Sequence, residues 1–212
     1  MKILSYDLGA TTGWCELILD NKTIKSIKFG IFNSSQSKIS SKKIINNIAQ
    51  TINQYEYVYD KAKKQENLSQ TSLERPIKSA IVTGYLSQNI NQQIKTFQPD
   101  IVAYEDIIFS KFTRATLALG SYMGLLTSLC INEYKVPVIP ILSGSHKFSK
   151  KKYPQYKDLP EKEFQANCII DVLKKHNTGI VIEDLLQKDY HNASDAISVG
   201  LCFATHYSLL KN

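Results

Sequence analysis

The sequence predicts an α/β domain in which a mixed five-stranded sheet is flanked by helices on both faces. Three observations lead to this prediction. The first thirty residues contain three short β-rich runs joined by turns, a pattern typical of an antiparallel meander. After residue 100, strand patterns alternate with helix patterns, as they do where helices connect parallel strands. The length of 212 residues suits one domain, 1–212, with a substantial core.

Apolar runs and turn residues define the N-terminal meander. A short strand is expected over residues 2–6, followed by a turn over 9–13 (GATTG). Two further strands are expected over 14–19 and 24–32, and the Asp-Asn pair at 20–21 favours a turn between them. Strands connected this closely in sequence pair antiparallel.

The middle of the chain is helical in pattern but interrupted. Isoleucines recur at helical spacing over 44–52, and a polar, charged stretch over 60–74 then breaks the pattern. We interpret this part as a connection between surface helices or as an insertion around 55–80. Helical spacing returns over 77–97 and stops before Pro99.

The second half alternates strands with helices. Residues 101–105 (IVAYE) have the pattern of a buried strand that ends on an acid, and 113–133 form a long, mostly apolar helix. A strand is expected over 136–141, a helix over 159–176, and a final helix over 192–209. These elements complete the predicted five strands.

Several classes of protein are excluded by composition. No run of about 18 apolar residues occurs, because Gly120 and Gly124 interrupt the best candidate at 115–131, so no membrane partner is expected. Asp7 comes too early for the apolar stretch of a signal peptide. The widely spaced cysteines indicate buried, reduced thiols and a cytoplasmic protein. They are Cys15, Cys130, Cys168 and Cys202.

The positive charge of the chain is concentrated in one loop. The sequence carries 26 Lys and Arg against 19 Asp and Glu, which gives a formal net charge of +7 and favours a polyanionic partner. Between His146 and Lys157 there is no acid, and aromatic residues lie among the lysines. Lysines neutralise phosphates and aromatic rings stack on unpaired bases, although a solvated loop has a similar composition. The candidate DNA-binding lysines are Lys147, Lys150, Lys151 and Lys152.

Three acids occupy positions where chemistry is expected. Asp7 ends the first strand, Glu105 ends the buried strand, and Asp195 lies at the start of the last helix. If the first two strands are parallel neighbours, Asp7 and Glu105 lie side by side at the carboxyl edge of the sheet. Clustered carboxylates repel one another unless a cation neutralises them, and oxygen donors suit Mg²⁺ or Mn²⁺. An acid of this kind taken alone is more often a helix cap or a strand-end charge, so the prediction depends on the three acids together.

Four segments together resemble one enzyme family. They are ILSYDLGATTGW, IVAYEDIIFSKFTRATLALGSYMG, the stretch from VPVIPILSGSHKFSKKK to PEKEFQANCIIDVL, and HNASDAISVGLCFATHY. Their order and content over 1–32 and 99–208 resemble the RuvC-type Holliday junction resolvases of the ribonuclease H-like superfamily. The resemblance implies a ribonuclease H-like fold, a homodimer, and a nuclease of DNA recombination and repair that cuts branched DNA, especially four-way junctions, by paired nicks. It also implies two Mg²⁺ ions at each site, replaceable by Mn²⁺, held by Asp7, Glu105 and Asp195.

Further residues follow from the same resemblance. The family carries an acid or a His three residues before its last Asp, and here Asn192 stands at that position with His191 beside it. The fourth ligand is therefore His191, the Asn192 carbonyl or water. An aromatic side chain after the second acid stacks at the exchange point of the junction, where Phe109 matches better than Phe112. The accompanying basic residues are Lys111 and Arg114.

Two further observations leave alternatives open. The chain before IVAYE is longer than in bacterial RuvC, which indicates a viral, phage or otherwise divergent member. The segment DLGATTG also fits the phosphate-binding hairpin of actin-like and sugar-kinase ATP-binding proteins, although that fold needs two such domains and 212 residues are too few. A DNA-binding scaffold without activity is a third possibility. Within the nuclease class, a ribonuclease H-like enzyme on RNA–DNA hybrids and a flap or branch nuclease of broader specificity are the alternatives.

Overall fold

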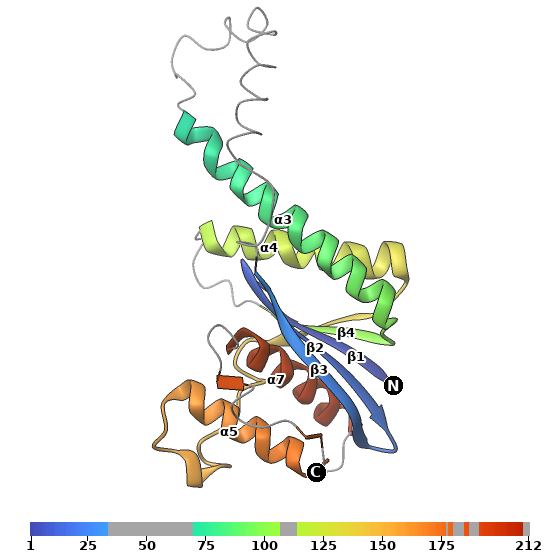
Figure 1. Ribbon diagram of the computed structural model, residues 1–212, viewed down its shortest axis with the longest axis vertical. Helices are drawn as coiled ribbons and strands as arrows, with labels where there is room; N and C mark the ends of the chain where they lie inside the picture. Colours follow the sequence, from blue (N-terminus) through green and yellow to red (C-terminus); the bar gives the residue numbers. More distant parts are fainter. Residues whose placement is uncertain (34–69, 107–113, 177, 180–184, 187–190, 210–212) are drawn as a thin grey trace, which may run out of the picture.

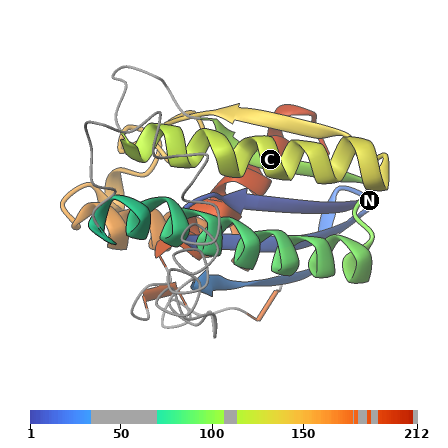
Figure 2. The same ribbon diagram turned by 90° about the horizontal axis from the view of Figure 1, so that it is seen from above.

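The computed structural model describes residues 1–33, 70–106, 114–176, 178–179, 185–186 and 191–209. In these residues the chain forms three layers, with a central sheet between two pairs of helices (Figure 1). The view from above shows α3 (Gln70–Phe97) and α4 (Arg114–Ser128) lying over the sheet (Figure 2). The predicted arrangement of helices on both faces is confirmed.

The sheet has five strands in the order β3-β2-β1-β4-β5. The strands are β1 (Lys2–Asp7), β2 (Thr11–Asp20), β3 (Thr23–Asn33), β4 (Ile101–Asp106) and β5 (Val138–Leu142). The first three pair antiparallel, whereas β4 runs parallel to both β1 and β5. The mixed five-stranded sheet predicted from the sequence is therefore present.

The antiparallel hairpin is longer than predicted at both ends. Asn21 and Lys22 adopt positive φ angles of 47° and 61° between the paired residues Asp20 and Thr23. Two left-handed residues in a two-residue loop match the twist of the flanking strands and give a tight hairpin. At the other end, β2 begins at Thr11 rather than at residue 14, because the ladder with β3 continues to the end of that strand.

Two helices and a π-helical segment cover one face of the sheet. They are α3 (Gln70–Phe97), α4 (Arg114–Ser128) and the π-helix Leu129–Tyr134. The largest buried side chains that join them to the sheet are Leu4, Tyr6, Leu86, Ile90, Ile94 and Leu126. The helix predicted over 113–133 thus changes to wider turns at residue 129, and α3 begins within the polar stretch that we interpreted as an insertion. The rest of that stretch lies outside the described residues.

The other face carries α5 (Glu161–Lys174) and α7 (His191–His206). The buried side chains between these helices and the sheet include Ile3, Leu17, Ile169, Ile170, Leu173 and Ile197. The last helix stops earlier than predicted, because Ser208 takes a positive φ of 52° and the Leu209 N–H donates to the Ala204 carbonyl. A left-handed residue with this bond is a common helix terminator.

The four cysteines are free, and Cys15, Cys130 and Cys168 are buried. Burial raises the pKa of Cys130 to about 12 and that of Cys168 to about 11, so both remain thiols at neutral pH. None of the described helices is both long enough and apolar enough to cross a bilayer.

Candidate active site

The alternation of side chains along the two central parallel strands directs two acids to the same face. On β1, Ile3 and Ser5 face α7, and on β4, Ala103 packs in the same layer. Because strand side chains alternate, Asp7 and Glu105 point to this face as well. Tyr6 pairs with Tyr104 across the two strands, so the acids that follow them leave the sheet at the same edge. The predicted neighbourhood of Asp7 and Glu105 is present in the structure.

The third acid comes from α7, whose first turn rests directly on β2. A Cβ atom at Gly13 would lie 1.8 Å from the Asn192 carbonyl oxygen and 2.7 Å from the Ala193 nitrogen. Only glycine allows this approach, since real Cβ atoms never come so close to backbone atoms. The Asn192 Nδ2 also donates to the Thr11 carbonyl at 2.8 Å. The start of α7, and with it Asp195, is therefore fixed against the strand that follows Asp7.

One turn further on, α7 crosses β1 at small residues. The Ser5 hydroxyl donates to the Ala196 carbonyl at 2.7 Å, and a Cβ atom at Gly200 would lie 2.7 Å from the Ser5 Oγ. Ser5 is fully buried, and its bond satisfies a carbonyl oxygen in the helix. This contact explains a serine in the middle of an otherwise apolar strand.

The three carboxylates affect one another electrostatically. Burial, followed by the charges of Asp195 and Glu105, raises the pKa of Asp7 to about 8, although Lys147 acts in the opposite direction. An acid with this pKa is largely protonated at neutral pH in the absence of a cation. The cluster therefore has unfavourable negative charge that a bound cation would neutralise.

The effects on the pKa of Asp195 are similar, but raising and lowering effects are more evenly matched. Burial raises its pKa, the charges of Lys147 and His146 lower it, and Glu105 raises it again. His191, the first residue of α7, also lowers the pKa of Asp195. Lys147 and His146, which both lower the pKa of Asp195, come from the loop that follows β5.

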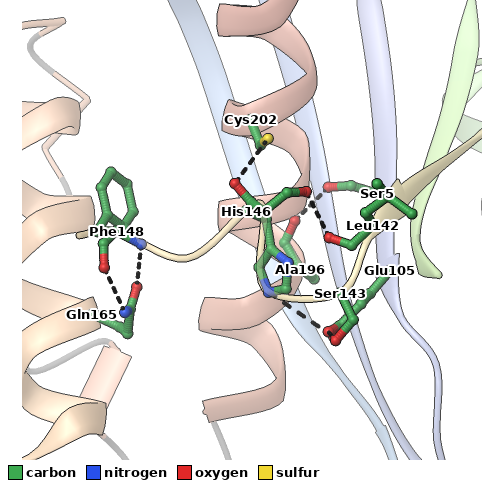
Figure 3. Close-up of polar contacts among 10 residues, drawn as sticks. Ser5, Glu105, Leu142, Ser143, His146, Phe148, Gln165, Ala196 and Cys202 are labelled. Carbon is green, nitrogen blue, oxygen red and sulfur yellow. Dashed lines mark hydrogen bonds and ion pairs between the residues drawn. The ribbon is translucent and has the colours of Figure 1, made fainter. Parts of the chain in front are cut away.

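That loop contacts Glu105 directly, as Figure 3 shows. The Ser143 hydroxyl donates to the Glu105 Oε1 at 2.7 Å, and the His146 Nε2 lies 4.0 Å from the Glu105 Oε2. The loop reaches Glu105 because β5 pairs parallel with β4 and Glu105 lies opposite Ile141. Ser143 thus fixes one carboxylate oxygen, and the other faces the imidazole.

His146 is buried without a hydrogen-bond partner. Its side chain is 0% exposed, and neither ring nitrogen has a partner among the described residues. Burial lowers the pKa of His146, although Glu105 and Asp195 raise it. Burial is the larger of these effects, which favours the neutral imidazole at neutral pH.

No sequence pattern assigns a site role to Ser143 or His146. The proximity of His146 to Glu105 depends on the register of β5 against β4, which residue patterns do not give. The only indication in the sequence is that His146 begins the lysine-rich loop. Lys147 was predicted as a DNA-binding residue, and it additionally affects the pKa of Asp7 and of Asp195.

The structure describes only some of the remaining predicted site residues. Phe109, Lys111 and Phe112 lie outside the described residues, and Arg114 is described only as the first residue of the α4 backbone. Lys151 and Lys152 are exposed. Lys150 instead turns back, since its Nζ donates to the Lys157 carbonyl at 2.9 Å and lies 5.7 Å from the centre of the Phe164 ring.

The donor set fits a hard divalent cation in its chemistry. Asp7, Glu105 and Asp195 supply only carboxylate oxygens, and their mutual repulsion is what a cation would relieve. In the described part of the chain, no three Asp, Glu, His or Cys side chains converge closely enough to hold a metal ion by themselves. The fit therefore rests on the type and charge of the donors.

Asp7→Asn is expected to stabilise the metal-free protein, and more so as the pH rises. The pKa of Asp7 rises from the ordinary value of 3.8 to about 8 in the fold, so the folded protein favours the protonated carboxyl. The free energy of unfolding therefore falls as the pH rises above about 4, and the loss is complete once the pH passes about 8. The gain in unfolding free energy should grow from pH 4 to pH 8 and reach a few kcal/mol, because each pH unit between the unfolded and folded pKa values contributes about 1.4 kcal/mol at most. Urea denaturation in EDTA at a series of pH values measures it.

Asp20, the exposed last residue of β2, provides the control for removing one carboxylate. Asp20→Asn removes an exposed carboxylate and should change stability by no more than about 0.5 kcal/mol. A gain for Asp7→Asn that does not depend on pH would contradict the burial and charge effects described for Asp7.

Comparison with known proteins identifies the fold. No protein-family model and no curated protein sequence matches the chain. Among solved structures, Thermus thermophilus RuvC matches with a TM-score of 0.56 at 15% identity, covering 100% of this chain and 99% of that one. The same protein in complex with a Holliday junction substrate matches at 0.56 and 14% identity, over 99% and 96% of the two chains.

A eukaryotic and a viral resolvase are also similar. The yeast mitochondrial Holliday junction resolvase Ydc2 matches with a TM-score of 0.52 at 12% identity, covering 97% of this chain and 80% of that one. The fowlpox virus Holliday junction resolvase has the same score and identity, with coverage of 97% and 99%. These similarities show that the chain has the ribonuclease H-like fold of the RuvC-type resolvases, as the sequence motifs predicted.

Proposed function

We propose that this protein is a divalent-metal-dependent endonuclease that resolves four-way DNA junctions. One observation carries the proposal: the charges of Glu105 and Asp195 act on the buried Asp7 at one sheet edge, in a fold shared with Holliday junction resolvases. These acids come from positions about a hundred residues apart, and burial together with their proximity raises the pKa of Asp7. Such an unfavourable arrangement is typical of a functional site.

The neighbouring structures support branched DNA as the substrate. The T. thermophilus RuvC structure was solved with a Holliday junction substrate, and the yeast and fowlpox proteins are likewise Holliday junction resolvases. The coverage of this chain and of RuvC is nearly complete in both directions, so the similarity includes both ends of the sheet and the last helix.

In the proposed reaction, Asp7, Glu105 and Asp195 hold two Mg²⁺ ions, or Mn²⁺ in their place, with His191 or the Asn192 carbonyl as the fourth ligand. The bound ions supply Lewis-acid polarisation of the phosphate and activation of water. Ser143 holds one oxygen of Glu105 and so orients that carboxylate toward the site. Asp7 must lose its proton when the cation binds, since burial and its acidic neighbours keep it protonated otherwise.

Positively charged residues near the three acids attract the phosphodiester. Lys147 is exposed and acts on both Asp7 and Asp195, so it attracts the phosphate while limiting the negative field of the acids. Attack by water in line with the leaving oxygen gives a 3′-hydroxyl and a 5′-phosphate. In the same proposal Lys151 and Lys152 bind phosphates beyond the cleaved bond, and Phe109 stacks at the exchange point. Phe112, Lys111 and Arg114 are further proposed DNA contacts.

The decisive experiment compares substrates and metals with one preparation of the protein. A labelled mobile four-way junction and a linear duplex of the same sequence are incubated with Mg²⁺ or with EDTA. We expect paired nicks in the junction with Mg²⁺ only, and little cleavage of the duplex. Equal cleavage of flaps or of RNA–DNA hybrids would assign the broader nuclease activity, and binding without any metal-dependent cleavage would assign a scaffold.

Paired nicks at symmetric positions require two active sites, which we propose a homodimer provides. One face of α4 and of the π-helix after it is exposed and partly apolar, with Leu117 59% and Ile131 50% exposed. Added Cβ atoms at Gly120 and Gly124 would meet nothing within 4 Å among the described residues. These glycines therefore do not serve packing against the sheet, and they allow close approach of a second helix.

Gly124→Glu is expected to convert the dimer into a monomer without loss of stability. The new side chain has open space in the monomer, and replacing an exposed helical glycine favours the helix by about 0.5–1 kcal/mol. Light scattering after size exclusion measures the mass, and thermal unfolding measures stability. Gly84→Glu on α3, where Gly84 also has open space, is the matched control. A dimeric Gly124→Glu variant would place the interface elsewhere, and a monomeric wild type would contradict the homodimer.

A further inference from the structure

A separate pocket lies beside the carboxylate cluster, on the far side of the loop that follows β5. Its volume is about 490 Å³, within the range of small-molecule sites. The loop, the end of α5 and the outer part of α7 line it, and Figure 3 shows the loop passing from α7 to α5. None of Asp7, Glu105 and Asp195 is among its lining residues.

The lining of this pocket is cationic. Its cationic side chains are Lys147, Lys152 and Lys175, and His176 and His206 also line it. Among the described residues that line it, none is an acid. Lysines from the loop and from the end of α5 thus face one space, where their fields add and favour an anion.

Two buried polar side chains on the pocket wall have nitrogen or oxygen atoms without a hydrogen bond among the described residues. Ser198 is 2% exposed, and its hydroxyl has no hydrogen bond among the described residues. His146 is 4% exposed, and its Nδ1 has no hydrogen bond among the described residues, whereas its Nε2 faces the Glu105 carboxylate at 4.0 Å. Buried polar groups are nearly always hydrogen-bonded, so two unpartnered groups on one pocket wall indicate a ligand that supplies the partners.

Further groups on the wall suit a nucleotide. The rings of Phe148 and Tyr153 line the pocket and contact each other edge to face, with centres 5.4 Å apart. Such rings provide an apolar surface for a base. The His176 Nδ1 accepts from the Ile24 N–H at 3.4 Å, which places the hydrogen of a neutral ring on Nε2 as a free donor.

The pocket is already formed in the protein without ligand. The Phe148 N–H donates to the Gln165 Oε1 at 3.0 Å, and the Gln165 Nε2 donates to the Phe148 carbonyl at 3.3 Å. The Cys202 thiol donates to the Ser145 carbonyl at 3.6 Å, which attaches the same loop to α7 (Figure 3). A loop held at both sides loses little freedom when a ligand binds, and this favours affinity.

We propose that this pocket is a nucleotide-binding site separate from the carboxylate cluster. Lys152, Lys175 and the Ser198 hydroxyl hold the phosphate, and Phe148 and Tyr153 contact the base. The ligand is a nucleoside monophosphate unit, either free or as one nucleotide of a nucleic-acid strand. Binding needs neither metal nor any of the three acids, so the site can be tested independently of the proposed nuclease activity.

The test is calorimetric titration of the full chain with thymidine 5′-monophosphate in EDTA. Lys152→Ala and Lys175→Ala should each weaken binding about tenfold, the loss expected for one charge-assisted hydrogen bond. Lys174→Ala is the matched control, because Lys174 is exposed, adjacent in sequence and not part of the lining. Ser198→Ala should weaken binding without lowering the melting temperature, since its hydroxyl makes no hydrogen bond in the free protein.

Two additional ligands distinguish the source of the nucleotide. Thymidine without phosphate should bind far more weakly than the monophosphate. If a short single-stranded oligonucleotide shows the same pattern of variant effects and the monophosphate does not bind, the ligand is a nucleotide within a strand, as proposed. Equal effects of Lys174→Ala and Lys175→Ala on both ligands would overturn the site. Loss of binding in Asp7→Asn would overturn its separation from the carboxylate cluster, whereas loss of nicking alone in that variant would not affect it.

Discussion

Glu105→Gln, Asp7→Asn and Asp195→Asn are each expected to abolish the nicking of four-way junctions while junction binding is retained or slightly strengthened. Each change removes a carboxylate oxygen that is proposed to hold the metal pair and also removes a negative charge that repels phosphate. We expect the rate to fall by about a thousandfold or more, equivalent to about 4 kcal/mol of activation free energy. Single-turnover cleavage of a labelled junction measures the rate, and fluorescence anisotropy measures binding.

The surroundings of each acid allow a loss of catalysis to be distinguished from a loss of folding. A Gln at position 105 keeps an oxygen that accepts from the Ser143 hydroxyl, so the loop after β5 retains its contact with β4. An Asn at position 7 removes a buried charge whose neighbours destabilise it. These variants should therefore melt at the wild-type temperature or above it. Inactivity together with a lowered melting temperature would instead indicate a structural role.

Metal removal and a distant carboxylate provide the controls. EDTA should reduce wild-type nicking to the level of the three variants, and added Mg²⁺ or Mn²⁺ should restore it only in the wild type. Glu163→Gln removes one exposed acid from α5 and should leave the rate within about twofold of wild type. If any one of the three variants cuts at a rate near that of the wild type, the residue changed is not a metal ligand.

Gly13→Ala is expected to destabilise the protein and to inactivate it, although Gly13 takes no part in the chemistry. The added methyl group would lie 1.8 Å from the Asn192 carbonyl oxygen and 2.1 Å from its carbon. These are backbone atoms, so no side-chain rotation relieves the contact, and the start of α7 must move away from β2. Overpacking of this kind costs about 1–3 kcal/mol or more. Asp195 moves with the helix, and a displacement of about 1 Å can reduce the rate a hundredfold.

Gly84→Ala is the matched control for this substitution. A Cβ atom at Gly84 meets nothing within 4 Å among the described residues, and the residue lies in the exposed interior of α3. Alanine there should stabilise the helix by up to about 1 kcal/mol and leave nicking unchanged. The assay for Gly13→Ala is run at a temperature where the variant is still folded. Wild-type stability and activity in Gly13→Ala would show that α7 can shift without consequence for the site.

The sheet and two of the three acids are predictable from the sequence because strong local patterns determine them. The strand patterns before Asp7 and Glu105 are apolar and short, and both run into a polar end at the acid. Parallel pairing then brings their carboxyl ends to one edge without further information. Asp195 follows from the helical pattern after it, but its distance from the other two depends on how closely α7 approaches the sheet.

That approach could not be predicted, because it depends on packing between distant segments. Gly13 has the appearance of a turn glycine within GATTG, yet it lies inside β2 and provides space for the α7 backbone. The contacts of Ser143 and His146 with Glu105 likewise depend on the register of β5. That strand begins at Val138 rather than at residue 136, where the Val136 N–H still donates to the Cys130 carbonyl within the π-helix.

The two outer strands of the sheet influence how the protein behaves at high concentration. In the described residues β3 and β5 form the edges, and unpaired edge strands are templates for aggregation through added strands. β3 carries exposed Lys25 and Lys28, whose like charges oppose pairing with the same strand of another molecule. β5 is only five residues long and contains Pro140, which has no N–H to donate to an incoming strand. Replacing these lysines with valine would therefore lower solubility while leaving the fold and the carboxylate cluster unchanged.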